Sequence, residues 1–110
     1  LGGRPGLYAQ GPDHSPIAPI ISVQGRTDVV RVANNSDFGL AASLWTGDLE
    51  CASRLARLLD VGVVFINSIV KSDPRMPFGG VKKSGFGREL SKHGIREFVN
   101  VKGINIYPGS

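Results

Sequence analysis

Two apolar runs separated by an amphipathic helix pattern constrain the fold of this chain more than any other feature. Leu40–Thr46 predicts a short strand, and Val61–Val70 is an almost continuous apolar run. A run of the second kind is typical of a strand buried on both faces of a parallel sheet. Trp45 and Phe65, one in each run, are expected in the core. Asp48 is a good N-cap for the helix between them, whose apolar positions recur at helical spacing: Leu49, Ala52, Leu55, Ala56 and Leu59.

Upstream of these runs the sequence predicts one more strand and a short helix. Ile17–Val23 is apolar and β-branched but broken by a proline, which is typical of an edge strand. Thr27 is a candidate cap for a helix that ends at the Asn34–Asn35 pair. Strand, helix, strand, helix and strand in this order predict an α/β fold, with a parallel-type layer of three short strands and helices.

The C-terminal third has a different character. A glycine-rich stretch, Met76–Gly87, follows the apolar runs, and a short helix is predicted near Glu89–His93. The last segment, Phe98–Tyr107, alternates apolar and polar residues as a strand does, and nothing upstream is an obvious hairpin partner. Because an unpaired terminal strand usually joins another sheet edge, we expect an oligomer.

These patterns divide the chain into three parts. Residues 1–16 are predicted to be a loop or tail left from a preceding region, and residues 17–97 the α/β part. Residues 98–110 are predicted to be an oligomerisation strand with its tail. A chain of 110 residues holds one compact core and not two.

Much of the excess positive charge lies in one span. The net charge is +4, and five cations lie in that span: Lys82, Lys83, Arg88, Lys92 and Arg96. A solvated basic face is the simplest interpretation. A nucleic-acid-binding surface would have exposed aromatic residues between the cations, and we expect neither these nor a nucleic-acid partner.

Cysteine usage and hydropathy indicate a compartment. Cys51 is the only cysteine, so an internal disulfide is excluded and a reducing compartment fits. No apolar run approaches the roughly 18 residues needed to cross a bilayer, and no signal peptide is visible. We therefore expect a cytoplasmic protein without a membrane partner. The chain begins at Leu1, which favours a fragment or a processed product.

None of the short motifs supplies a complete catalytic constellation. Gly85–Gly87 does not follow a strand as a dinucleotide-binding turn must, and Phe86 stands where a phosphate loop needs lysine. Cys51 lies early in the predicted helix, where a thiol can be activated, but a small core residue is the commoner role. His93 has no second ligand at metal-binding spacing, so no metal is expected.

Pro77–Glu89 reads PFGGVKKSGFGRE and is similar to the PFGGxKxSGxGRE signature of aldehyde dehydrogenases. Three further segments resemble that family in the same order: Ala33–Ala42, similar to its AN-x-x-x-(F/Y)GLAA stretch; Val63–Asn67, similar to the strand that leads into its substrate loop; and Phe98–Lys102, similar to the start of its last strand. The resemblance implies the C-terminal part of the catalytic domain and the final strand of the oligomerisation region.

The resemblance also implies two substrate-binding residues. Phe78 matches an aromatic residue that lines the aldehyde tunnel, where an apolar wall excludes water and orients the carbonyl. Ser72 matches a serine that helps to hold the substrate carboxylate in succinate-semialdehyde dehydrogenases, and Ser72–Arg75 is similar to bacterial enzymes of that subgroup. The alternative role of Ser72 is that of a turn residue before Asp73–Pro74.

Several parts of the family's reaction have no match in this chain. In the family a cysteine attacks the aldehyde and a glutamate acts as base, both before the segment seen here. NAD or NADP is held by a separate dinucleotide-binding domain. Cys51 matches a helix position, not the nucleophile. Gly11–Pro16 stands where the family carries a glutamate-rich motif that holds the nicotinamide ribose. Leu1–Arg4 resembles an earlier stretch of the family, so the chain looks shortened between Tyr8 and Gly11.

The first functional hypothesis is therefore a C-terminal portion of an NAD(P)-dependent aldehyde dehydrogenase that oxidises an aldehyde, with succinic semialdehyde as the candidate, to a carboxylate. It would supply a tunnel wall and an intersubunit strand, and alone it would neither bind the cofactor nor turn over. Its partners would be further copies or the remainder of the enzyme, together with a small aldehyde. The alternative is a stand-alone, non-catalytic interaction and oligomerisation module.

Overall fold

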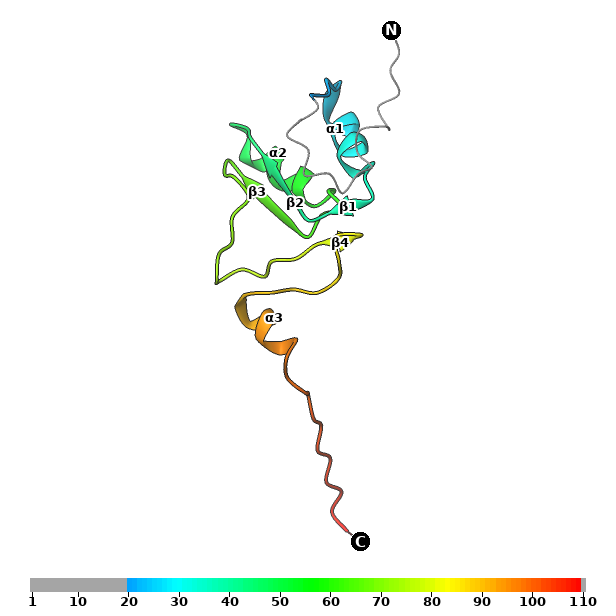
Figure 1. The fold of residues 1–110 in the computed structure, drawn as a ribbon, viewed down its shortest axis with the longest axis vertical. Coiled ribbons are helices and arrows are strands. Elements are labelled where there is room, and N and C mark those ends of the chain that lie inside the picture. Colours follow the sequence, from blue (N-terminus) through cyan, green and yellow to red (C-terminus); the bar gives the residue numbers. More distant parts are fainter. Residues whose placement is uncertain (1–19, 110) are drawn as a thin grey trace.

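The computed structural model of the chain describes residues 20–109, which form a small α/β unit with a long C-terminal extension (Figure 1). The predictions for residues 1–16, and those for the first three residues of the Ile17–Val23 strand, lie outside the described residues. The elements in chain order are α1 (Gly25–Asn34), β1 (Phe38–Gly39), β2 (Ala41–Leu44), α2 (Leu49–Ala56), β3 (Val63–Ile66), β4 (Val81–Lys82) and α3 (Ser91–Arg96).

The centre of the fold is a strand–helix–strand unit. Strands β2 and β3 pair in parallel, with Ala41 opposite Val63, and α2 connects them. Asp48 caps α2 as predicted, because its Oδ1 accepts a hydrogen bond from the Cys51 N–H at 2.8 Å. The helix ends at Ala56, earlier than the apolar pattern predicts, and a tight turn follows it.

The core around this unit is small. Among the described residues the buried apolar side chains are Cys51, Ala52, Leu59 and Val63. Phe65 is half-buried, and Trp45 is 66% exposed, so the prediction that Trp45 lies in the core is wrong. Trp45 follows the last residue of β2 and has no sheet neighbour. Strand β3 is mostly half-buried because each strand of a two-stranded sheet is an edge.

Within residues 20–109 the parallel layer has two strands instead of the predicted three. Residues 20–23 form no strand, and Ile20 is 97% exposed. An apolar, β-branched sequence becomes a strand only where a neighbour accepts its hydrogen bonds, and none does so among the described residues. Instead β1 and β4 form a separate antiparallel pair, with Phe38 opposite Lys82. Two residues per strand are too few to show a periodicity in the sequence.

Helix α1 starts earlier than predicted and ends where predicted. It begins at Gly25, so Thr27 lies inside it and is not its cap. The Asp28 carboxylate accepts a hydrogen bond from the Gln24 N–H at 3.2 Å and satisfies the amide that precedes the first turn. The helix ends at Asn34, as the asparagine pair indicates.

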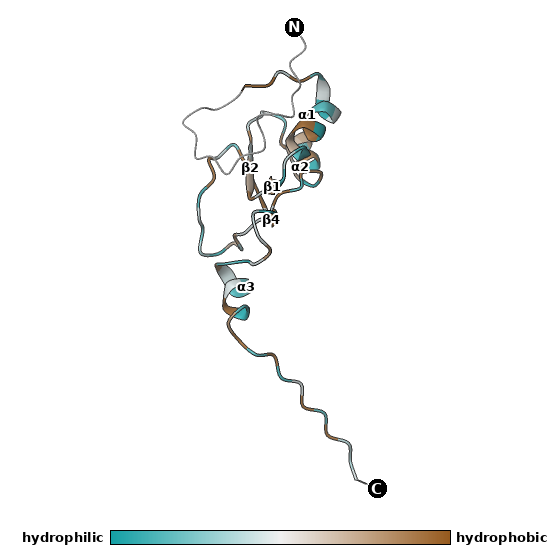
Figure 2. Cartoon of the chain, turned by 45° about the vertical axis from the view of Figure 1, so that its right-hand side comes forward, coloured by the Kyte–Doolittle hydropathy of each residue, from teal (hydrophilic) through white to brown (hydrophobic). Residues whose placement is uncertain are grey.

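The C-terminal arm, residues 98–109, leaves the body of the molecule after α3 and extends away from it (Figure 1). The predicted strand over Phe98–Tyr107 is not formed, because no described residue pairs with it; its strand character stays a prediction. Hydrophobic and hydrophilic residues alternate along the arm (Figure 2). Its apolar side chains are exposed, among them Val101 at 85% and Ile106 at 83%. No helix within residues 20–109 is both long and apolar enough to span a bilayer.

Candidate functional site

The segment between β3 and β4 carries both of the predicted substrate residues, Ser72 and Phe78. Phe78 is held by a two-way backbone bridge to Glu89. The Phe78 N–H donates to the Glu89 carbonyl at 2.9 Å, and the Glu89 N–H donates back at 2.8 Å. Phe78 and Glu89 both belong to Pro77–Glu89, which we call the signature segment. The bridge therefore fixes the aromatic residue from within that segment.

Phe78 is half-buried and lines an open groove of about 510 Å³, the Phe78 groove. The other residues that line it are Leu40, Gly79, Gly87, Arg88, Glu89, Glu97 and Phe98. A half-buried aromatic residue that lines a groove is partly accessible to a ligand, unlike a core residue. The geometry therefore suits the wall of a substrate tunnel, which is the role that the sequence predicts.

Close backbone approaches explain why the signature segment is rich in glycine. A Cβ on Gly62 would lie 1.7 Å from the carbonyl oxygen of Gly79, and a Cβ on Gly79 would lie 2.2 Å from that of Gly87. Arg88 Nη1 donates to the carbonyls of Gly80 at 2.7 Å and Gly87 at 2.8 Å. The backbone next to Phe78 is therefore packed with no room for side chains, and Arg88 holds its carbonyls together.

Ser72 lies apart from the Phe78 groove. It is exposed, is not among the residues that line the groove, and makes no hydrogen bond to another described residue. Arg75 is engaged by Asp73: Nε donates to Oδ1 at 2.9 Å and Nη2 to Oδ2 at 2.7 Å. These hydrogen bonds lower the pKa of Asp73 and raise the pKa of Arg75. Two of the guanidinium nitrogens are thus occupied within the loop, and the role of Ser72 stays a prediction.

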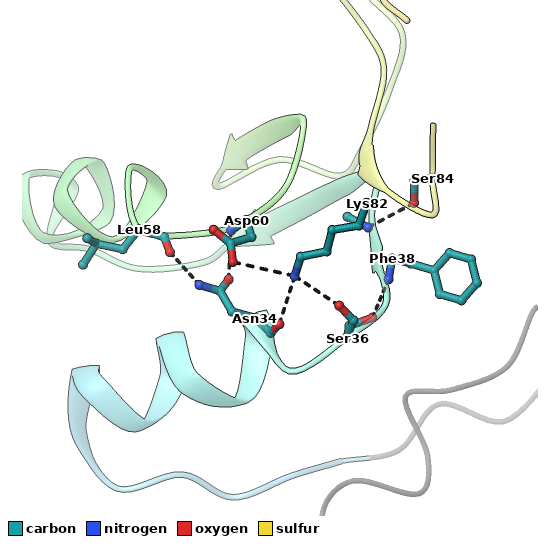
Figure 3. Close-up of polar contacts among 8 residues, drawn as sticks. Asn34, Ser36, Phe38, Leu58, Asp60, Lys82 and Ser84 are labelled. Atoms are coloured by element: carbon teal, nitrogen blue, oxygen red, sulfur yellow. Dashed lines mark hydrogen bonds and ion pairs between the residues drawn. The ribbon is translucent and has the colours of Figure 1, made fainter. Parts of the chain in front are cut away.

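A polar network that the sequence patterns do not reveal surrounds the side chain of Lys82 in β4 (Figure 3). The ammonium group of Lys82 donates to the carbonyls of Asn34 at 2.9 Å and Ser36 at 3.1 Å, and lies 3.7 Å from Asp60 Oδ2. The Asn34 side chain donates to the Leu58 carbonyl and accepts from the Asp60 N–H, each at 2.8 Å. We call these five residues the Lys82 network. In the sequence Asn34 indicates only a helix end, and Lys82 only a basic face.

The basic span is exposed at four of its five cations, as a solvated face predicts: Lys82, Lys83, Lys92 and Arg96. Some of its cations also have partners in the fold. Lys82 and Arg88 donate to backbone carbonyls, and Lys83 pairs with Asp37. Phe86 is 99% exposed within this span, contrary to the expectation of no exposed aromatic residue there.

The thiol of Cys51 does not face Phe78. Cys51 is 8% exposed and lies on α2, where it lines a hollow between α1 and α2 that also includes Val30 and Leu55. The Phe78 groove is lined by other segments. The interpretation of Cys51 as a small core residue therefore agrees with its burial.

The one parallel strand–helix–strand unit does not fit a dinucleotide. In such sites a glycine-rich turn brings the pyrophosphate to the helix N-terminus. Here the turn between β2 and α2 contains only Gly47, and the Asp48 carboxylate occupies the N-terminus of α2. A negative charge at that point repels a phosphate, so no step involving NAD(P) is assigned to these residues.

The pattern of the aldehyde dehydrogenase family matches residues 9–104 of this chain, which is most of its length. The chain belongs to the aldehyde dehydrogenase family. A probable NADP(+) succinate-semialdehyde dehydrogenase of Synechocystis sp. is 49% identical to it over 89 residues, which are 81% of this chain and 20% of the relative. Family membership is thus shown by similarity over the same segments that carry the signature.

Solved structures of aldehyde dehydrogenases share the fold. Succinic semialdehyde dehydrogenase from Streptococcus pyogenes, in complex with NADP+, is 42% identical with a TM-score of 0.74, over 76% of this chain and 18% of that chain. The NAD-dependent aldehyde dehydrogenase from Sinorhizobium meliloti is 36% identical with a TM-score of 0.76, over 82% of this chain and 18% of that chain. The chain spans about a fifth of the length of the curated relatives it matches.

Proposed function

We propose that this chain acts as the C-terminal portion of an NAD(P)-dependent aldehyde dehydrogenase, in which Phe78 forms part of the substrate tunnel. The observation that carries the proposal is the half-buried Phe78 on an open groove, held by its backbone bridge to Glu89. The accessible part of the Phe78 ring would shield an aldehyde from water and orient the aldehyde carbonyl. The reacting thiol would come from another region, since Cys51 is buried elsewhere. The chain alone would then be inactive.

Succinic semialdehyde is the proposed substrate. The relative from Synechocystis and the structure from Streptococcus pyogenes both carry that name. Ser72 is exposed in the loop that leads to Phe78, where its hydroxyl is free to donate one hydrogen bond to the substrate carboxylate. NADP or NAD would be bound by the rest of the enzyme.

The C-terminal arm is proposed to pair with a sheet edge of another copy or of the remainder of the enzyme. Its alternating apolar residues are exposed, and an extended segment of this kind is covered when it adds a strand to a sheet. Burial of these side chains would contribute about 25 cal/mol for each Å² removed from water.

A chimeric enzyme tests this function. Residues 20–109 would replace the matching C-terminal segment of the Synechocystis relative, and oxidation of succinic semialdehyde would be followed by NADPH absorbance. We expect turnover by the chimera and none by the 110-residue chain alone. A chimera that assembles and binds NADP+ but oxidises no aldehyde would contradict the proposal.

Two substitutions in the chimera separate the proposed roles. Ser72→Ala should raise KM for succinic semialdehyde by about tenfold, as expected for one lost hydrogen bond to a charged group, and leave KM for butanal unchanged. Butanal has the same number of carbon atoms and no carboxylate. Phe78→Ala should lower kcat/KM for both aldehydes. Equal effects of Ser72→Ala on the two aldehydes would favour the turn-residue role.

A further inference from the structure

Lys82 joins parts of the fold that are distant in the sequence. Its ammonium group contacts the carbonyls of Asn34 and Ser36 at the end of α1, 48 and 46 residues away. The last carbonyls of a helix have no partner within the helix, and a cation there also interacts favourably with the helix dipole. The Asn35 N–H donates to the carbonyls of Arg31 and Val32, and Lys82 adds a partner for the carbonyl of Asn34.

The same helix end is attached to the connection between α2 and β3. The Asn34 side chain bridges the Leu58 carbonyl and the Asp60 N–H, and the Asp60 carboxylate faces the ammonium group of Lys82 (Figure 3). The end of α1, the α2–β3 connection and β4 therefore meet at Lys82. The polar hollow at this point, about 610 Å³, is lined by these residues together with Asn35, Ser36, Asp37 and Lys83. This hollow is not an anion site, because Lys82 and Lys83 both have acidic partners.

A short, tightly packed backbone links Lys82 to Phe78. Only Gly79, Gly80 and Val81 lie between them, and a Cβ on Gly80 would lie 2.5 Å from the Cβ of Ser84. Lys82 itself has a φ of 56°, a left-handed conformation that a lysine adopts only where its surroundings impose it. With so little free space, we expect a displacement of the Lys82 backbone to shift Phe78.

We propose that Lys82 is a positioning residue for the substrate wall: by binding the end of α1 it fixes β4 and thereby the location of the Phe78 ring. The expected effect of Lys82 on aldehyde oxidation rests on the proposed function. The expected effect of Lys82 on the location of Phe78 is independent of that function, and the two effects are measured separately.

The location of Phe78 is measured on the 110-residue chain by ¹⁹F NMR. The five phenylalanines are replaced by 4-fluorophenylalanine, and the Phe78 signal is assigned by Phe78→Leu. Lys82→Met should broaden or split that signal, and Lys82→Arg, which keeps the charge and the donors, should restore it. Lys83→Met is the matched control, because Lys83 pairs only with the exposed Asp37 side chain; it should leave the signal unchanged. An unchanged Phe78 signal in Lys82→Met would overturn the proposal.

In the chimera, Lys82→Met should raise KM for succinic semialdehyde by about tenfold with kcat within about twofold, because a misplaced wall weakens binding. A purely structural role would instead reduce the amount of folded enzyme and leave KM unchanged. If Lys82→Met does not fold, Lys82→Gln is compared with Lys82→Arg. A lower Tm in Lys82→Gln with an unchanged Phe78 signal and KM would overturn the proposal; a broadened signal supports it even if the chimera is inactive.

Discussion

At the scale of single residues, backbone contacts between glycines set the tolerance of the fold to change. Gly62→Ala should lower the free energy of unfolding by about 3 kcal/mol, because its Cβ would overlap the Gly79 carbonyl and only backbone could move. Gly47→Ala is the control, since a Cβ there meets nothing within 4 Å. Urea denaturation of the two variants measures the difference. Equal stability of Gly62→Ala and the parent chain would show that the two backbones do not touch.

The Asp73–Arg75 pair makes a prediction about pH. Hydrogen bonds from the Arg75 side chain lower the pKa of Asp73 from its ordinary value of 3.8. Because the folded pKa is the lower one, the contribution of the pair to stability is present above about pH 4 and is lost as the pH falls through the lowered value. The contribution is small, since Arg75 is exposed. The ¹³C signal of the Asp73 carboxyl should titrate below the ordinary value of 3.8. In Arg75→Gln it should titrate closer to that value, with the hydrogen bond from the backbone N–H of residue 75 retained, and an unchanged titration would contradict the side-chain pairing.

At the scale of elements, the stability of α2 depends on its first turn. Asp48→Ala should cost about 1 kcal/mol, because the Cys51 N–H loses its acceptor. Asp48→Asn keeps an acceptor oxygen at the same place and should cost less. The midpoints of urea denaturation provide the comparison. An equal loss of stability in the two variants would show that the loss comes from the negative charge of Asp48 near Arg26, and not from the cap.

At the scale of the whole molecule, the shape of the chain is elongated. Its extents are 79 × 32 × 28 Å and its radius of gyration is 19.1 Å, against about 13 Å for a compact domain of 100 residues. The C-terminal arm accounts for the longest dimension (Figure 1). The described part of the chain thus combines a small core with an arm whose apolar side chains are exposed.

Assembly through the arm is tested by size-exclusion chromatography with light scattering. If the arm pairs as proposed, the chain should form oligomers whose population rises with concentration. Deletion of residues 98–110 should give a monomer. Val101→Lys combined with Ile104→Lys keeps the length of the arm and should also give a monomer, since lysines at these apolar positions oppose strand pairing. A chain that is monomeric at every concentration would contradict pairing between copies of this chain.

The local elements were predictable where neighbouring residues decide them. The Asp48 cap, the end of α1 at Asn34 and the parallel pair β2–β3 follow from capping chemistry and from the spacing of apolar residues. The prediction of a buried Trp45 was wrong, and residues 20–23 of the predicted Ile17–Val23 strand form no strand, because both depended on a sheet neighbour that is absent among the described residues.

By itself the sequence determined the family, the glycine-rich segment and the aromatic residue at its centre, because each is carried by residues adjacent in the chain. Only the tertiary structure placed Phe78 on an open groove, Ser72 apart from that groove and Lys82 at the end of α1. The Lys82 contacts join residues 46 and 48 positions apart, and the Asn34 contacts join residues 24 and 26 positions apart. Contacts at such separations leave no periodic trace in a sequence, since they depend on how elements pack and not on how each one forms.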